Sequence, residues 1–556
     1  MAVGLLVGCA SGLALGVGLA KTPWEKAWEK VFARRKARAD DDEDGVALPA
    51  SICRTSRPPS VYAGGFARWS SGAGSVGKVF GCEEGTGSEV LSPGVRRLSQ
   101  NKRRRDSALF TQVEQRVTEE KLVIVMVGLP ARGKSYISKA LVRYLNFLGC
   151  TTSLFNAGSL RRDEGGAGVS ASYFDPNNLD AKAQREAMAM QCLEELLGFL
   201  REKGNNVGIL DATNTTIDRR TKVRNRCAKE QGISVIFLES LCTDSSVLEE
   251  NYRLKLVNDD YKGMDAEEAT ADFLQRVVKY EEAYQPVEDV EDGVEMSYIK
   301  LIDAGKKLTK NLCLASARKS LPGHVFNLLH SIHLGPRSIF LALVGESEND
   351  VVRRFGGDSA LTPAGQQRGP ALAKFLDKHE AEVREQAIPG SDVEPTLVMC
   401  GTLQRHLHTA HHLKLSRTHR RSRTILKLQR LNELCVGGLD GMTRDEVEEY
   451  HSEESRGMLE NKLTYRYPGE GGESYQDLIL RLHENILRLE QLRGSALLLC
   501  DPGVFRVFLA YFRGTPLEQI HELEVPKGVI QLTRTHSGFQ EMRIDIPVPK
   551  LEDWSP

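Results

Sequence analysis

A glycine-rich segment that ends in a lysine and a serine is the clearest chemical signal in this sequence. The segment Gly128-Leu129-Pro130-Ala131-Arg132-Gly133-Lys134-Ser135 matches the pattern G-x-x-x-x-G-K-[ST]. Its glycines let backbone N–H groups curl around phosphate oxygens at the start of a helix. Lys134 would reach the β- and γ-phosphates of a nucleoside triphosphate, and the Ser135 hydroxyl would bind Mg²⁺.

The residues on either side supply the strand and the helix that such a loop requires. Residues 121–128, KLVIVMVG, form an apolar run typical of a buried strand, and residues 136–149 have a helical pattern. We therefore interpret the segment as a nucleotide-binding loop and not as a chance glycine-rich turn. The motif does not identify the group that accepts the phosphate.

A carboxylate follows the second apolar strand of this region. Asp211 ends the run VGILD at residues 207–211. The end of a parallel strand faces the same crevice as the phosphate loop, so this carboxylate could hold a metal-bound water or orient an acceptor hydroxyl. An aspartate at a strand end is also a common helix cap. Its pairing with the phosphate loop favours the functional interpretation.

Basic residues are frequent in the same half of the chain. A phosphorylated acceptor needs cationic partners, and the fork of a guanidinium suits a phosphate group. Each of these residues alone could be a surface charge, but as a group they suggest a phosphorylated substrate. They are Arg161, Arg162, Arg185, Arg219, Arg220, Lys255 and Arg276.

The elements that must position these residues alternate between strand and helix. Apolar runs at 121–128, 207–211 and 234–240, with a helical stretch at 181–204, predict a doubly wound parallel sheet. A second α/β series has strands at 338–344, 396–400 and 495–500, with helical stretches at 361–379 and 474–492. We place a boundary near 325–336, which gives an N-terminal segment 1–105 and domains 106–330 and 331–556.

Composition narrows the class of protein. The 74 basic and 75 acidic residues nearly balance, so overall charge makes no case for a nucleic-acid partner. The 11 scattered cysteines include no C-x-x-C pair, which is typical of reduced thiols in a cytoplasmic protein.

The first 105 residues have a different character. Residues 1–20 are apolar and uncharged, and the basic stretch 30–38 follows them, so this segment could anchor the chain to a membrane or act as a disordered or targeting extension. Residues 39–105 are rich in Gly, Ser, Pro and Arg and are predicted to be a disordered linker. Ser99 follows an arginine pair, as in substrates of basophilic protein kinases.

Longer strings resemble a known family. GLPARGKSYISKAL, FNAGSLRR (155–162), DATNTTIDRR (211–220), FLESLCTD (237–244) and YEEAYQP (280–286) are similar to the kinase half of the 6-phosphofructo-2-kinase/fructose-2,6-bisphosphatase family. GPRSIF (335–340), GESEND, GGDSALTPAG, LNEL, RYPGEGGESYQDL and FLAYF (508–512) resemble its phosphatase half, which has a phosphoglycerate-mutase-like α/β fold. The resemblance covers roughly residues 120–545.

The resemblance implies an enzyme that moves the γ-phosphoryl group of ATP, with Mg²⁺, to the 2-hydroxyl of fructose 6-phosphate. It implies nucleotide contacts from Gly128, Leu129, Pro130, Ala131, Arg132, Gly133, Lys134, Ser135, Tyr136 and Asn251, with the metal at Ser135. It implies sugar-phosphate contacts from Arg162, Arg185, Thr213, Arg219, Lys255, Arg276 and Tyr280. Catalytic roles fall to Lys134, Asp211 and Cys242. The loop 163–179, DEGGAGVSASYFDPNNL, departs from the family pattern, which bears on the choice of acceptor sugar.

The second half differs from the family at the residues that carry out the phosphatase reaction. The family forms a phosphohistidine in an Arg-His-Gly-Glu string, but this chain has Leu343-Val344-Gly345-Glu346. A second histidine is replaced by Asp501, whose carboxylate is expected to repel a phosphoryl group. The other positions are retained at Arg354, Arg405, Glu433, Lys462, Tyr475 and Arg506 and changed at Ser455 and Met458. We expect His406, His408, His411 and His412 to lie on a helix surface rather than to act as nucleophiles.

The leading hypothesis is therefore a fructose 6-phosphate 2-kinase whose phosphatase half is inactive and could serve in dimer contacts, ligand sensing or control of the kinase. One alternative is a non-catalytic regulator that binds nucleotide or sugar phosphate, although intact Lys134, Ser135 and Asp211 argue against it. The other is a kinase for a different phosphorylated acceptor. Turnover of nucleotide that depends on fructose 6-phosphate separates an enzyme from a binding module.

Overall fold

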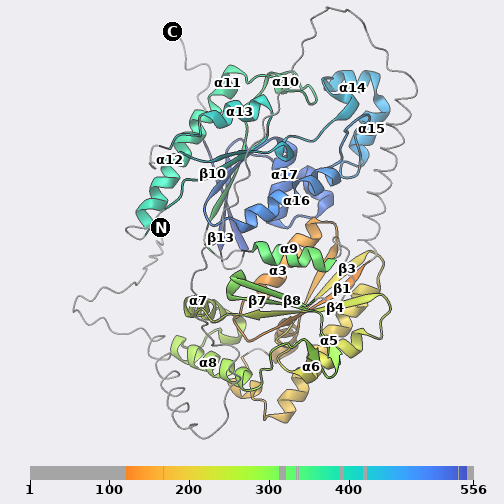
Figure 1. Ribbon diagram of the computed structural model, residues 1–556, viewed down its shortest axis with the longest axis vertical. Coiled ribbons are helices and arrows are strands. Elements are labelled where there is room, and N and C mark those ends of the chain that lie inside the picture. Colours follow the sequence, from red (N-terminus) through yellow and green to blue (C-terminus); the bar gives the residue numbers. More distant parts are fainter. Residues whose placement is uncertain are drawn as a thin grey trace, which may run out of the picture. The chain divides into compact units, whose positions relative to one another are not determined.

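The computed structural model describes residues 120–166, 168–311, 321–332, 335, 337–387, 393–416, 422–535 and 538–546. These residues contain two six-stranded sheets, each with helices on both faces (Figure 1). The apolar segment 1–20, the linker 39–105 and Ser99 lie outside the described residues. In the part of the chain that is described, no helix combines the length and the apolar composition needed to cross a bilayer.

The first sheet has the strand order β2-β3-β1-β4-β7-β8. Its strands are β1 (Lys121–Val127), β2 (Thr151–Asn156), β3 (Asn205–Asp211), β4 (Ile233–Leu241), β7 (Tyr298–Ile302) and β8 (Lys307–Asn311). The first five are parallel, as predicted for this doubly wound sheet, and β8 adds an antiparallel strand at the β7 edge. Only the four residues 303–306 connect β7 to β8, so there is no room for a crossover helix and the two strands form a hairpin.

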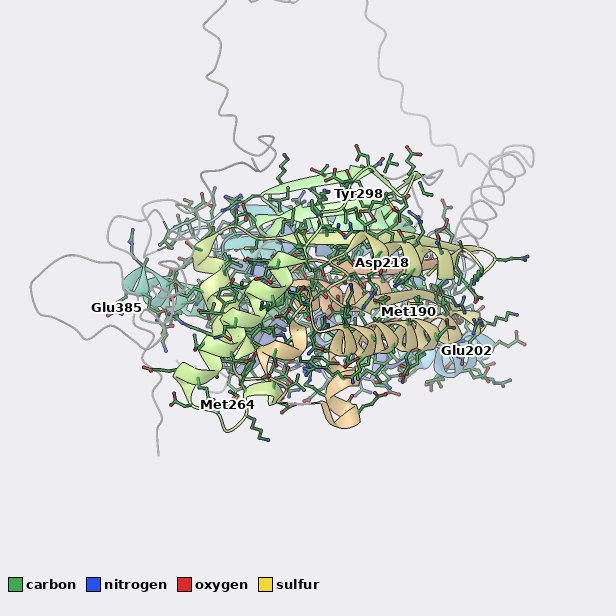
Figure 2. All side chains as sticks on the ribbon, turned by 90° about the horizontal axis from the view of Figure 1, so that it is seen from below. Met190, Glu202, Asp218, Met264, Tyr298 and Glu385 are labelled. Carbon is green, nitrogen blue, oxygen red and sulfur yellow. The ribbon has the colours of Figure 1, made fainter. Side chains whose placement is uncertain are left out.

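The helices of this half lie on both faces of the sheet, because β1 is buried on both sides. Alternate residues of β1 pack against α3 (Lys134–Phe147) and α9 (Leu321–Ser331) on one face and against α5 (Leu179–Arg201) and α6 (Ile217–Cys227) on the other. Figure 2 shows α5 and α6 side by side, with Met190 and Asp218 labelled. The remaining helices are α4 (Ala157–Arg161), α7 (Ser245–Lys255) and α8 (Ala266–Glu282), and a small hairpin joins β5 (Val290–Glu291) to β6 (Val294–Glu295).

The second sheet has the order β11-β10-β12-β9-β13-β14. Its strands are β9 (Ser338–Leu343), β10 (Leu397–Cys400), β11 (Ile425–Lys427), β12 (Ala496–Cys500), β13 (Val529–Thr535) and β14 (Gly538–Ile544), and the last two are antiparallel. One face packs on α12 (Arg368–Gln386) and α13 (Gln404–His411), and the other on α16 (Tyr475–Gln491) and α17 (Pro502–Arg513). Short helices α10 (Glu348–Val351), α11 (Pro363–Gln366), α14 (Arg444–Tyr450) and α15 (Ser452–Glu460) complete this half.

One apolar core runs through both halves. The face of the first sheet that carries α3 and α9 continues into the face of the second sheet that carries α16 and α17. Phe147 of α3 meets Tyr511 of α17 edge to face, with ring centroids 5.3 Å apart. The helix that follows the phosphate loop is thus also part of the contact between the two halves.

Candidate nucleotide and sugar-phosphate site

The phosphate loop connects β1 directly to α3, as the sequence predicts. Gly128 has φ +137°, and a Cβ there would lie 2.6 Å from the carbonyl oxygen of Ser240 on β4. Both its backbone conformation and the close approach of β4 therefore require glycine. The Gly128 amide donates to the Thr213 carbonyl at 2.9 Å, and Gly133, with φ +83°, begins α3. The loop is thereby fixed to the strand ends around it.

Lys134 and Ser135 project from the first turn of α3 toward the ends of the neighbouring strands. The Ser135 hydroxyl donates to Asp211 Oδ2 at 2.9 Å, and the Asn156 amide donates to the same oxygen at 2.7 Å. Lys134 Nζ donates to the Leu129 carbonyl at 2.6 Å. The structure thus brings the predicted lysine, serine and aspartate together at the carboxyl ends of β1 and β3.

The loop is braced by α7. Asn251 donates to the Ala131 carbonyl at 3.0 Å, and Arg132 donates to the hydroxyl of Tyr252 at 3.0 Å. Ala131 has φ +58°, a conformation that an alanine keeps only when its surroundings impose it. Asn251 therefore contacts the backbone of the loop, next to its predicted nucleotide position. Tyr136, the last predicted nucleotide contact, accepts a hydrogen bond from Arg534 instead.

The electrostatics of this site favour an anionic ligand. Burial lowers the pKa of Lys134 to about 7; Asp211 opposes this shift, whereas Lys255, Arg132 and Arg276 reinforce it. Burial also lowers the pKa of Lys255, with Asp211 again opposing. Because these cations repel one another in the free protein, a bound phosphate would relieve that repulsion.

A buried carboxylate organises the predicted sugar-phosphate residues. Asp260 accepts from Arg161 Nη2 at 2.8 and 2.6 Å and from Arg276 Nη1 at 3.3 Å, and Arg162 Nη1 lies 3.9 Å from it. This carboxylate therefore holds three guanidinium groups in one place. The sequence carried no signal for Asp260, since it lies in a short 3-10 helix, Asp259–Tyr261, outside any motif.

The divergent loop covers the same arginines. Phe174 is 4% exposed, and the Arg276 guanidinium lies 3.8 Å from the centre of its ring. The ring of Tyr280 is 5.7 Å from that of Phe174. The amide of Ala171 donates to Asp272 on α8 at 2.7 Å, which docks the loop on that helix. A loop that has changed in sequence thus still reaches the site.

The other predicted residues divide into two groups. Arg185 stacks over Tyr173 at 5.6 Å, and Arg219 pairs with Glu186 at 2.7 Å beside it, so both stay near the site. Arg220, in contrast, is fully buried and forms an ion pair with Glu291 at 2.6 Å. Its proposed place in the phosphate-binding cluster is wrong, because burial and this pairing direct it into the core beneath α6.

Cys242 lies just after β4, at the same edge of the sheet. Its thiol is half-buried, and its Sγ lies 3.9 Å from the Asp244 carbonyl oxygen. Burial raises the pKa of this thiol above its usual value. A raised pKa favours the protonated thiol, and the catalytic role of Cys242 stays a prediction.

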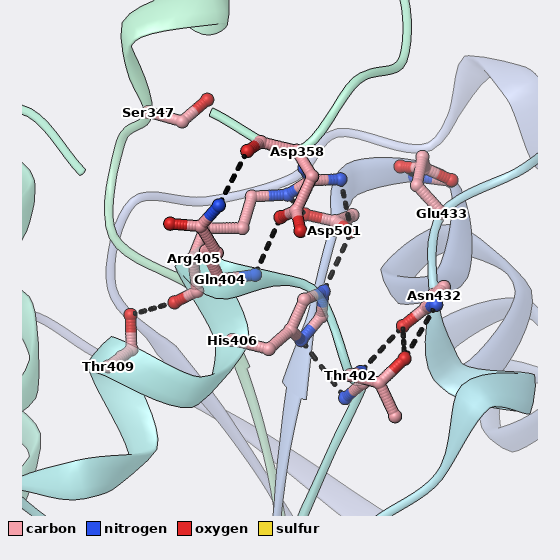
Figure 3. Close-up of polar contacts among 12 residues, drawn as sticks. Ser347, Asp358, Thr402, Gln404, Arg405, His406, Thr409, Asn432, Glu433 and Asp501 are labelled. Carbon is pink, nitrogen blue, oxygen red and sulfur yellow. Dashed lines mark hydrogen bonds and ion pairs between the residues drawn. The ribbon is translucent and has the colours of Figure 1, made fainter. Parts of the chain in front are cut away.

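At the corresponding site of the second half, polar side chains bond to one another (Figure 3). Arg405 Nε and Nη2 donate to the two oxygens of Asp501 at 2.7 and 2.9 Å. His406 Nδ1 accepts from the Gly401 amide at 3.1 Å, so its other nitrogen carries the proton and donates to Asp501 at 2.8 Å. The carboxylate that was expected to repel a phosphoryl group is thus bound by Arg405 and His406.

His406 is fully buried, so the expectation that it lies on a helix surface is wrong; His408, His411 and His412 are exposed, as expected. Residue 406 points inward because the carboxylate of Asp501 provides a buried partner for it. Although burial by itself raises the pKa of Asp501, the hydrogen bond from His406 and the Arg405 guanidinium lower it to about 2.

Three other residues of this site, Glu433, Arg506 and Arg354, form hydrogen bonds to backbone groups of the second half. Glu433 accepts from the amides of Leu434 and Gly503, both at 2.8 Å, and burial together with Asp501 raises its pKa. Val344 packs against the apolar core at the end of β9 and offers no nucleophile. Arg506 donates to the Leu523 carbonyl at 3.0 Å, Tyr475 begins α16, and Lys462 is exposed after α15. Arg354 donates to the Gly441 carbonyl, and Ser455 and Met458 lie on α15.

These observations define a P-loop nucleotide-binding domain joined to a second α/β domain. Residues 110–326 match the model of the 6-phosphofructo-2-kinase family, and residues 344–545 match that of branch 1 of the histidine phosphatase superfamily. The chain belongs to the 6-phosphofructo-2-kinase/fructose-2,6-bisphosphatase family.

Relatives with these names align with most of the chain. A 6-phosphofructo-2-kinase/fructose-2,6-bisphosphatase of Caenorhabditis elegans is 38% identical over 419 residues, 74% of this chain and 86% of the relative. A probable 6-phosphofructo-2-kinase of Schizosaccharomyces pombe is 35% identical over 455 residues, 73% of this chain and 67% of the relative. The 6-phosphofructo-2-kinase 1 of Saccharomyces cerevisiae is 37% identical, and the match spans 49% of its length.

Binding of ATP near pH 8 is expected to take up roughly one proton at Lys134. With a pKa of about 7 the amine is mostly neutral in the free protein at that pH, and the phosphates would favour its charged form. Isothermal titration calorimetry in buffers of different ionisation enthalpy measures this uptake. Lys134→Arg is the matched control, because a guanidinium stays protonated. Equal proton uptake by both proteins would contradict the assignment.

Replacement of Asp501 by asparagine is expected to open the second pocket to anions. The variant leaves Arg405 without its carboxylate, which costs on the order of 3–5 kcal/mol of stability when a buried pair is broken. Added inorganic phosphate should then raise the unfolding temperature of Asp501→Asn but not that of the wild type. Adding Arg405→Met to the variant should remove the effect, and phosphate binding by the wild type would show that the pocket is not already filled.

Proposed function

We propose that this chain transfers the γ-phosphoryl group of ATP to the 2-hydroxyl of fructose 6-phosphate. The observation that carries the proposal is the proximity of Lys134, Ser135 and Asp211 at the carboxyl ends of β1 and β3, near the arginines gathered on Asp260. Membership of the family adds the acceptor, since the relatives are named as 6-phosphofructo-2-kinases.

The residues of the loop suit the phosphates of a nucleotide. Lys134 would leave the Leu129 carbonyl and contact the β- and γ-phosphates, which restore a full charge to its amine. The oxygen donors Ser135 and Asp211 lie 2.9 Å apart and fit Mg²⁺, which prefers oxygen ligands. When bound there, Mg²⁺ would neutralise charge on the transferred phosphoryl group.

The arginines would hold the phosphate that the sugar already carries. Arg162 and Arg276 both lie within 4 Å of the same oxygen of Asp260, at 3.9 and 3.3 Å, and Lys255 lies close enough to affect the charge of Lys134. In the transfer, the sugar 2-oxygen bonds to the γ-phosphorus as the bond to the ADP oxygen breaks. The hydroxyl proton would pass to Asp211 or to water. Positioning and neutralisation of charge then supply most of the rate increase.

The second half, in this proposal, does not hydrolyse the product. Val344, which directly follows β9, cannot form a phosphoenzyme, and Asp501 holds Arg405, the arginine that would bind the leaving phosphate. The proposal also places the chain in the cytoplasm, where buried thiols such as Cys192 and Cys227 stay reduced. A homodimer stays a prediction.

A coupled assay with ATP, Mg²⁺ and fructose 6-phosphate tests the kinase. We expect fructose 2,6-bisphosphate to form, and Lys134→Ala and Asp211→Asn to lower kcat/KM by roughly 100-fold or more, as for other groups that act on the transition state. Lys222→Ala is the control, because that lysine is exposed on α6 away from the loop. Its activity should match the wild type.

Two results would redirect the proposal. Binding of ATP without turnover that depends on fructose 6-phosphate would leave a regulator. Turnover with another sugar phosphate but not with fructose 6-phosphate would mean that the loop containing Phe174 has changed the acceptor.

A further inference from the structure

A buried carboxylate of the second half lies at the side of the helix that follows the phosphate loop. Glu490 of α16 is 1% exposed and accepts from Arg143 of α3 at 2.9 Å and from Tyr511 of α17 at 2.7 Å. Arg337 donates to it at 3.1 Å, and Arg534 of β13 lies 3.7 Å away. One carboxylate thus compensates three guanidinium groups, of which one belongs to the kinase half.

The same group of residues contacts α3 at two places. Arg143 lies in its third turn, and its guanidinium stacks over the ring of Tyr511 at 4.9 Å. Tyr136 lies in its first turn, where its hydroxyl accepts from Arg534 and its ring faces that guanidinium at 4.9 Å. Both contacts depend on arginines that Glu490 keeps in place.

Tyr136 directly follows Lys134 and Ser135 in the first turn. A helix is stiff and rises about 1.5 Å per residue, so a displacement at Tyr136 moves the two functional residues with it. Such a displacement would change the 2.9 Å hydrogen bond between Ser135 and Asp211. An error of about 1 Å in the position of a reacting group can lower a rate by roughly 100-fold.

We infer that Glu490 is a positioning residue for the kinase site: by holding Arg143 and Arg534 against α3, it fixes the helix that carries Lys134 and Ser135. The inference rests on the proposed binding of ATP at this loop. It gives the second half a function in the kinase reaction that needs neither a phosphohistidine nor a ligand in its own pocket.

The alternative is that these ion pairs only hold the two halves together. The apolar contacts between the halves do not involve the carboxylate: Phe147 packs on Tyr511, and α9 packs between α3 and α16. Removing the charge of Glu490 therefore leaves this apolar contact, and a loss of kinase function without loss of the fold would separate the two explanations.

Glu490→Gln tests the inference, with Glu380→Gln as its matched control. Glu380 is also a buried carboxylate of the second half and also pairs with an arginine, Arg423, at 2.8 Å, but it lies on α12, which packs on the opposite face of the second sheet from α16 and α17. Equilibrium dialysis with labelled ATP, steady-state kinetics and thermal unfolding would be measured for both full-length variants. We expect Glu490→Gln to weaken ATP binding about 10-fold and to lower kcat, following the sensitivity of rate to position.

The control should lose stability while its ATP affinity stays within about two-fold of the wild type, because distant sites act independently. Tyr511→Phe removes only the hydroxyl that donates to Glu490 and should weaken ATP binding in the same direction, by roughly three-fold for one lost hydrogen bond. If Glu490→Gln does not fold, Tyr511→Phe still tests the inference.

Equal losses in the Glu490 and Glu380 variants would overturn the inference, as would ATP affinity unchanged in both Glu490→Gln and Tyr511→Phe. Failure of the wild type itself to bind ATP would instead refute the proposed function. The two failures are therefore distinguishable.

Discussion

The placement of α3 is the constraint on which both halves of this chain depend. Its N-terminus carries Lys134 and Ser135, its apolar face completes the core of the first sheet, and its side chains Arg143 and Tyr136 reach the second half. Because one rigid helix performs all three tasks, the geometry of the phosphate loop cannot change without affecting the contact between the halves. A phosphatase-like domain can therefore be retained for its contribution to the kinase.

Buried carboxylates paired with arginine have opposite consequences in the two pockets. Asp260 gathers several guanidinium groups, and Lys255 and Lys134 lie close by, so a surplus of positive charge remains for phosphate groups. Asp501 meets Arg405 with both oxygens and takes a further hydrogen bond from His406, so no such surplus remains. The pairing of a carboxylate with arginine thus leaves positive charge for an anion at Asp260, whereas at Asp501 the carboxylate itself neutralises the arginine.

Short sequence patterns predicted the features that depend on residues close together in the chain. The phosphate loop, Asp211 at the end of β3 and the main strands follow from spacing and apolar runs, and the structure has them there. The burial of His406 and Arg220 was not predictable, because each is set by a partner about 70 to 95 residues away, Asp501 or Glu291. Asp260 and Glu490 carry no motif at all. Asn156, at the end of β2 beside Asp211, could have been found by the same strand-end argument.

In the function proposed above, this chain makes fructose 2,6-bisphosphate and does not break it down. The most direct measurement is ³¹P nuclear magnetic resonance of the product formed by the wild-type protein, followed after glucose and hexokinase have consumed the remaining ATP. If the second half is inactive, the resonance of the phosphate on carbon 2 will persist and inorganic phosphate will not accumulate. A decay of that resonance that requires the protein would contradict it, and would mean that the second half hydrolyses the ester without a histidine at Val344 or Asp501.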